Sequence, residues 1–92
     1  MNDYRDWRTL REIDLASGSA KGAAFRCFRA LEAQWRAGID YRVLHHVEDR
    51  AAIAALRAAG RIYAGSVNVV LLGESAASQI LEALRRHGSA QG

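Results

Sequence analysis

Residues 19–37 read S-A-K-G-A-A-F-R-C-F-R-A-L-E-A-Q-W-R-A, and this stretch largely decides the fold. Wound as a helix at about 100° per residue, it separates into an apolar side and a cationic side. The apolar side is formed by Ala24, Phe28, Leu31 and Trp35. The opposite side carries Gly22, Arg26, Arg29 and Arg36. This pattern predicts a helix that packs on a small core and offers cations to an anionic partner.

Capping signals on the N-terminal side of this stretch predict a shorter first helix. Thr9 and Glu12 have the spacing of a capping box, so we expect a helix from Thr9 to about Ala16. A Ser-Gly pair at 17–18 ends that helix, and Ser19 is a suitable N-cap for the long second one. The sequence therefore predicts two consecutive helices joined by a tight turn.

The remainder of the chain predicts strands that alternate with two further helices. Gly38 ends the long helix, and residues 39–47 alternate like a half-buried strand. The acidic pair at 48–49 starts a third helix that ends at Gly60. Residues 61–72 are rich in β-branched side chains and form either one bulged strand or a tight hairpin. A last helix begins at Ser75.

Length and composition indicate one small α+β domain. The 92 residues are half hydrophobic and contain no proline, which suits a single domain (1–92) with an ordered core at about 7–87. We expect the helix-turn-helix-like pair and two further helices to pack on a sheet of two or three strands, paired either in parallel or antiparallel. The expected core residues are Ile13, Leu15, Phe25, Phe28, Leu31, Trp35, Val43, Leu44, Ile53, Leu56, Ile62, Val67, Val69, Val70, Leu71, Ile80, Leu81 and Leu84. Such a core is modest, so a homodimer is expected to supplement it.

Membrane and export signals are not evident in the sequence. Residues 1–6 are polar, and no apolar run approaches the length of about 18 residues that spans a membrane. Cys27 is the single cysteine, so no intramolecular disulfide is expected, and its place at the edge of the apolar stripe indicates a small core residue. The expected location is cytoplasmic.

The basic residues are almost all arginine. Twelve arginines accompany one lysine, and the net charge is +3. The planar guanidinium group suits phosphates, guanine edges and carboxylates. A GC-rich coding sequence would also favour arginine and alanine, so the excess is explained either by binding or by codon composition.

The first two expected helices, T-L-R-E-I-D-L-A and S-A-K-G-A-A-F-R, resemble a helix-turn-helix. With the following strand, G-I-D-Y-R-V, residues 7–43 resemble the small excisionase-like winged-helix regulators of phages and mobile elements. In that family the second helix enters the major groove and the following hairpin touches the DNA backbone. The resemblance implies DNA contacts from Ser19, Lys21, Gly22, Arg26 and Arg29, and a phosphate contact from Arg42.

Two further observations concern the turn between these helices. A helix N-terminus offers free amide groups and partial positive charge, so Ser19 and Lys21 at that end would favour a phosphate. Asp14 departs from the helix-turn-helix pattern, which has a small buried residue there if Gly18 is the turn glycine.

The region around residues 60–68 and the histidines carry the other candidate motifs. On a hairpin, four side chains would be displayed like a wing: Arg61, Tyr63, Ser66 and Asn68. Alternatively, Tyr63 is half buried and Asn68 satisfies a turn. His45 and His46 would point to opposite sides of a strand, so no metal site is expected. No signature gathers Ser, His and Asp residues, so neither catalysis nor a cofactor is expected.

The sequence thus predicts a non-catalytic transcriptional regulator of phage or mobile-element type that binds double-stranded DNA as a homodimer. The expected DNA-binding residues are Ser19, Lys21, Gly22, Arg26, Arg29, Arg36, Arg42 and Arg61. The alternative is a small protein–protein interaction module, such as a phage-type inhibitor or an assembly subunit. That module would use the same cationic helix against acidic groups, or an exposed sheet edge.

Overall fold

The structure is a computed structural model that describes residues 4–91, with the side chains of residues 4–86. Its elements are β1 Arg8–Thr9, α1 Leu10–Ser17, α2 Ala23–Leu31, η1 Glu32–Gln34, β2 Tyr41–Leu44, α3 Arg50–Ala58, β3 Val69–Leu72 and α4 Glu74–Gln91. η1 is a single 3-10 turn. In the described residues, four α-helices accompany a three-stranded antiparallel sheet, which confirms the predicted α+β class.

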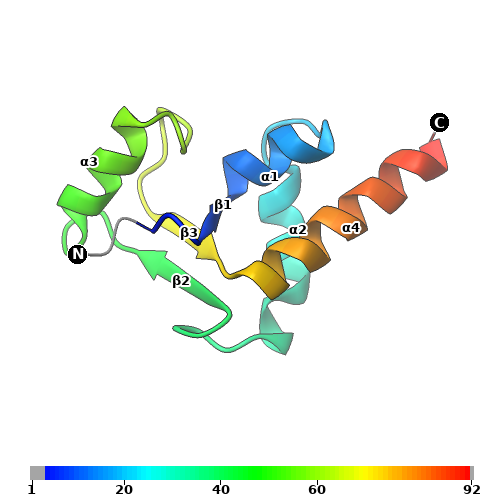
Figure 1. The fold of residues 1–92 in the computed structure, drawn as a ribbon, viewed down its shortest axis with the longest axis horizontal. Helices are drawn as coiled ribbons and strands as arrows, with labels where there is room; N and C mark the ends of the chain where they lie inside the picture. The colour runs from blue at the N-terminus through cyan, green and yellow to red at the C-terminus, as the bar shows by residue number, and fades with distance from the viewer. Residues whose placement is uncertain (1–3, 92) are drawn as a thin grey trace.

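The sheet separates the helices into two layers (Figure 1). Its strand order is β1-β3-β2, with Thr9 opposite Leu71 and Tyr41 opposite Leu72. Helices α1, α2 and α4 pack on one face, and α3 packs on the other. The antiparallel pairing excludes the parallel crossover that the sequence left open. The sequence did not indicate β1, because two residues carry no periodic signal.

The central strand β3 is packed on both faces because its side chains alternate between the two layers. Val70 and Leu72 face α1, α2 and α4, whereas Val69 and Leu71 face α3. The first cluster contains Ile13, Ala24, Phe28, Leu72, Ala76, Ala77 and Ile80. The second contains Leu44, Ile53, Leu56, Ile62, Val69 and Leu71. The two small cores therefore share one strand.

Four expected core residues are exposed. They are Leu15, Phe25, Val43 and Val67, with exposed fractions of 62%, 44%, 39% and 59%. Val67 lies in a loop, Phe25 lies at the border of the exposed side of α2, and Val43 lies on a terminal strand of the sheet. Buried apolar positions absent from the expected core are Ala24, Leu72, Ala76 and Ala77. Small alanines bury little area but let helices approach closely.

Helix α1 confirms the capping-box prediction. The amide of Glu12 donates to Thr9 Oγ1 at 3.1 Å, and the amide of Thr9 donates to Glu12 Oε1 at 2.9 Å. Gly18 ends the helix in the left-handed conformation, with φ 67°.

Helix α2 is shorter than the sequence indicated. It begins at Ala23 after Gly22, which has φ 95°, so Ser19 is not its N-cap. The helix ends at Leu31 and continues only as η1, several residues before Gly38. Nine residues plus one 3-10 turn replace the expected helix over 19–37.

The second half of the chain, within the described residues, holds two confirmed helices and two shortened strands. Within 39–47, only Tyr41–Leu44 is a strand, because Asp49 Oδ2 accepts from the amide of His45 at 2.9 Å and turns the chain into α3. Helix α3 ends near Gly60 as predicted. Residues 61–68 are a loop, so 61–72 is neither a bulged strand nor a hairpin. Helix α4 begins one residue before the expected Ser75.

Candidate nucleic-acid interface

Asp14 holds the turn between α1 and α2. It is 1% exposed, and its two carboxylate oxygens accept from backbone amides at the start of α2. Oδ2 accepts from the amide of Gly22 at 3.1 Å, and Oδ1 accepts from the amide of Ala24 at 2.8 Å. The hydroxyl of Tyr63 also donates to Oδ2, at 2.5 Å. One buried carboxylate therefore joins α1, α2 and the loop that follows α3.

This arrangement corrects the expected role of the N-terminus of α2. The sequence predicted free amides there that would receive a phosphate, but Asp14 already supplies an anionic acceptor for two of them. Ser19 faces Ser17 instead, with 2.7 Å between the two hydroxyl oxygens. Asp14, the residue that departs from the helix-turn-helix pattern, therefore caps the N-terminus of α2 from the preceding helix.

The exposed side of α2 carries two arginines. Arg26 and Arg29 are exposed, opposite the buried Ala24 and Phe28. Arg29 Nε lies 2.8 Å from Glu32 Oε1, with side chains 65% and 33% exposed. Surface ion pairs of this kind contribute little stability, so a phosphate can compete with the carboxylate for the guanidinium.

Gly22 and Lys21 precede these arginines. The φ of 95° explains the glycine, because side-chain-bearing residues rarely adopt that conformation. Lys21 is exposed, and its Nζ lies 4.9 Å from the centre of the Tyr63 ring. We call Lys21, Arg26 and Arg29 the α2 cationic face.

Tyr63 is half buried, as one of the two sequence interpretations predicted. Burial, followed by its hydrogen bond to Asp14, raises the pKa of Tyr63 to about 12. Asn68 satisfies a turn in the way that interpretation requires, because its Oδ1 accepts from the amide of His46 at 2.9 Å. The two side chains are therefore not displayed on a wing.

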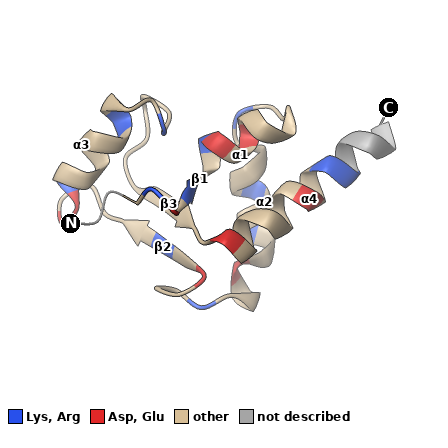
Figure 2. Ribbon diagram, viewed as in Figure 1, with Lys and Arg blue, Asp and Glu red and all other residues tan. Residues whose placement is uncertain are grey.

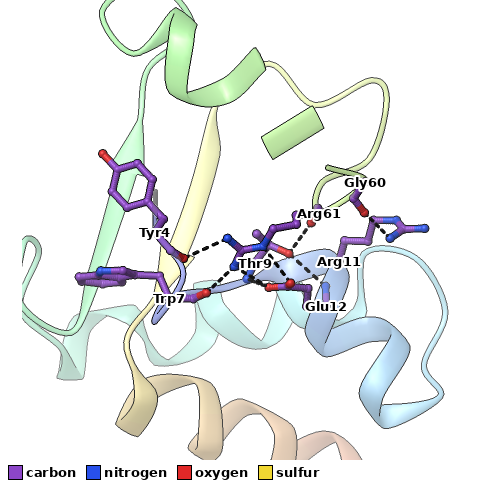
Figure 3. Close-up of polar contacts among 7 residues, drawn as sticks. All are labelled: Tyr4, Trp7, Thr9, Arg11, Glu12, Gly60 and Arg61. Carbon is purple, nitrogen blue, oxygen red and sulfur yellow. Dashed lines mark hydrogen bonds and ion pairs between the residues drawn. The ribbon is translucent and has the colours of Figure 1, made fainter. Parts of the chain in front are cut away.

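Arg61 is a structural residue, which corrects its expected place at the DNA (Figure 3). Its side chain is 18% exposed, and its Nε and one terminal nitrogen bind both oxygens of Glu12 at 2.9 and 3.1 Å. The guanidinium also donates to the carbonyls of Tyr4 and Trp7 at 3.0 and 2.5 Å. The carbonyl of Arg61 accepts from Thr9 Oγ1 at 2.5 Å. All three guanidinium nitrogens are therefore used inside the fold.

The Arg61 junction, as we name Tyr4, Trp7, Thr9, Glu12 and Arg61, ties the N-terminal segment to the loop after α3. Burial raises the pKa of the Glu12 carboxyl, but the hydrogen bonds and charge of Arg61, with hydrogen bonds from Thr9, outweigh it and hold that pKa below its usual value. The carboxylate therefore stays charged opposite the guanidinium.

Arg42 lies away from the α2 cationic face, and Arg36 lies beyond the C-terminal end of α2. Arg42 is stacked at 5.7 Å over the ring of Tyr4, which packs on the cluster containing α3, whereas the neighbouring Tyr41 meets Phe28 of α2 at 5.1 Å. Arg42 is thus on the opposite face of the sheet, and a duplex seated on α2 would not reach it. Arg36 is exposed in the segment after η1.

Charge alone does not single out one face of the molecule. Figure 2 shows lysine and arginine residues on most of the helices and strands. Helices α2 and α3 each contain two arginines and no acidic residue. What distinguishes α2 is that its arginines are one turn apart and follow a turn that holds a lysine, whereas α3 follows the acidic pair at 48–49 and its arginines are seven residues apart.

No group of three His, Cys, Asp or Glu side chains in the part of the chain that the structure describes has the geometry to hold a metal ion. Burial raises the pKa of the Cys27 thiol. Within residues 4–91, no helix combines the length and apolar character needed to cross a membrane.

Comparison with models of protein families, with curated proteins and with solved structures gives no match. Any function of this chain is therefore inferred from the geometry of its residues.

Proposed function

We propose that this protein binds double-stranded DNA through the α2 cationic face and acts as a non-catalytic regulator of phage or mobile-element type. The observation that carries the proposal is the exposed side of α2. Arg26 and Arg29 stand there on a helix without acidic residues, next to Lys21 in the preceding turn. Guanidinium groups neutralise phosphates and form paired hydrogen bonds with guanine.

The dimensions of α2 support this role. An α-helix with its side chains is about 10–12 Å across, which fits the major groove, about 12 Å wide. The Asp14 carboxylate fixes α2 against α1, so the arginines project from a rigid pair of helices. The antiparallel strands β2 and β3 follow this pair, but α3 lies between them in the sequence, so they do not form the hairpin of a winged helix.

The proposed surface is smaller than the set expected from sequence. It keeps Lys21, Gly22, Arg26 and Arg29, with Ser19 in the same turn and Arg36 beyond the far end of α2. Arg42 and Arg61 are excluded for the reasons given above. In this proposal the protein occupies a short operator in the cytoplasm, as a homodimer, and blocks or recruits polymerase without chemistry.

Fluorescence anisotropy of a labelled mixed-sequence duplex, at about 50 and about 200 mM salt, tests the proposal. We expect micromolar binding that weakens steeply with salt, because released counterions drive association with phosphates. A folded sample that shows no binding at tens of micromolar would overturn the proposal.

A second function, protein recognition by strand addition, is favoured by one specific observation. β2 is a terminal strand of the sheet, and exposed apolar side chains lie along it and beside it. These are Ile39, Val43 and Val47, with exposed fractions of 66%, 39% and 61%. An apolar terminal strand is a template for pairing with another chain. Substituting Val43 by lysine would abolish such pairing without changing DNA affinity, which separates the two functions.

A further inference from the structure

A small pocket lies between the α1–α2 turn and the loop after α3. Its volume is about 200 Å³, and its walls are mainly apolar, with Phe25, Ile62, Val69 and Val70 among them. The volume is below the roughly 300–1,000 Å³ of sites for drug-sized ligands and comparable to cavities of about 150 Å³ that hold benzene. The space therefore suits a single ring.

Two cations, Lys21 and Arg11, line the same pocket beside the ring of Tyr63. Lys21 Nζ lies 4.9 Å from the centre of that ring, and Arg11 Cζ lies 5.8 Å from it. Within the described residues neither cation forms an ion pair with a carboxylate; Arg11 donates only to the carbonyl of Gly60, at 2.7 Å. Both therefore retain N–H donors for an incoming anion.

The pocket wall also holds one carboxylate, that of Asp14, so its charged residues sum to +1. Asp14 accepts from the amides of Gly22 and Ala24 and from the hydroxyl of Tyr63, so its oxygens are already engaged with three donors. Apolar walls and two available cations are complementary to a flat apolar body with one negative charge.

We propose that this pocket binds a small aromatic carboxylate, with the ring against Phe25 and Val70 and the carboxylate between Lys21 and Arg11. Lys21 also belongs to the α2 cationic face, so the bound acid competes with a DNA phosphate for the same ammonium group. The pocket thereby couples a small-molecule signal to DNA affinity. The coupling depends on the proposed function, whereas binding of the acid to the free protein does not.

Phenylacetate is a suitable probe, and its neutral analogue phenylacetamide has the same shape. Titration into isotope-labelled protein, followed by amide NMR shifts and without DNA, should give saturable changes at the pocket residues at millimolar concentration. Phenylacetamide should bind about tenfold more weakly, because it lacks the charge-assisted contacts. Equal affinity for the two compounds, or no saturable shifts up to about 10 mM phenylacetate, would overturn the proposal.

Two matched variants test where the carboxylate of phenylacetate binds. Lys21→Gln should weaken phenylacetate binding about tenfold. Arg26→Gln removes an equal charge from a residue that does not line the pocket and should leave affinity unchanged. Equal effects from both variants would indicate general electrostatic attraction and contradict the proposed site. Phenylacetate binding without an effect on duplex affinity would remove only the coupling to DNA.

Discussion

Arginine has opposite roles at the Arg61 junction and on the α2 cationic face. At the junction, Arg61 is 18% exposed and donates from all three nitrogens to Glu12 and to two backbone carbonyls. On α2, Arg29 is 65% exposed and pairs only with a neighbouring surface carboxylate. The number of satisfied guanidinium donors, more than net charge, therefore distinguishes a structural arginine from one that is available to a partner.

Asp14 ties the start of α2 to α1 and to Tyr63, and its removal is the largest perturbation we expect. Asp14→Ala leaves the amides of Gly22 and Ala24 and the hydroxyl of Tyr63 without their acceptor. Each lost partner costs about 1–3 kcal/mol. Two of the three donors are only partly buried, so we expect the free energy of unfolding to fall by an amount at the lower end of the sum, about 3–5 kcal/mol. Urea denaturation followed by circular dichroism measures it.

Asp14→Asn is the matched control for this prediction. It keeps one acceptor oxygen and the side-chain volume, so its free energy of unfolding should fall clearly less than that of Asp14→Ala. An alanine variant that loses less than about 1 kcal/mol would show that α2 does not depend on this cap.

Arg61→Ala should have the next largest effect on stability. It leaves the half-buried Glu12 without its cation and frees the carbonyls of Tyr4 and Trp7. Loss of a fully buried pair costs about 3–5 kcal/mol, and partial exposure reduces the expected loss to about 2–3 kcal/mol. Arg61→Lys keeps the charge but not the fork of donors, so it should recover only part of the free energy of unfolding that Arg61→Ala loses. Unchanged urea midpoints would mean that the junction is not structural.

Titration to alkaline pH should show that the hydroxyl of Tyr63 ionises unusually late. The pKa of Tyr63 is raised to about 12 by burial and by its bond to Asp14, from an ordinary value of 10.0. The neutral phenol therefore stabilises the fold fully below pH 10, and this contribution is lost as the pH rises toward 12. Phenolate absorbance of the wild type should show a late step that is absent in Tyr63→Phe. A wild type with no such step would contradict the contact.

The smallest effect on stability is expected on the α2 cationic face. Arg26→Ala and Arg29→Ala remove exposed side chains, so each should change the free energy of unfolding by less than about 0.5 kcal/mol. Each should also reduce the salt dependence of duplex binding by about one phosphate contact. Destabilisation equal to that of Arg61→Ala would place these arginines among the structural ones.

Local signals in the sequence predicted those parts of the fold that local chemistry decides. The Thr9–Glu12 capping box predicted the start of α1, and Gly60 predicted the end of α3. The start of α2 could not be predicted in this way, because its cap comes from Asp14, eight residues before Gly22.

The candidate site was predicted only in part for the same reason. The spacing of Arg26 and Arg29 from Phe28 was sufficient to place both on the exposed side of α2. Nothing near Arg61 in the sequence indicates that Glu12, 49 residues away, would bind it. Residues 61–68 were expected to be extended because their side chains suit strands. In the structure Tyr63 of this loop binds the Asp14 carboxylate, and the carbonyl of Arg61 accepts from Thr9.

One comparison of charge reversals tests most directly whether α2 is the DNA-binding element. Arg26→Glu with Arg29→Glu reverses two charges on α2, and Arg42→Glu with Arg50→Glu makes the same net change at exposed residues in the other layer. Duplex anisotropy at about 50 mM salt should show binding lost in the first double variant and largely kept in the second, with both folded by circular dichroism. Equal loss in both would mean that net charge, and not the α2 cationic face, governs binding, and would contradict the account.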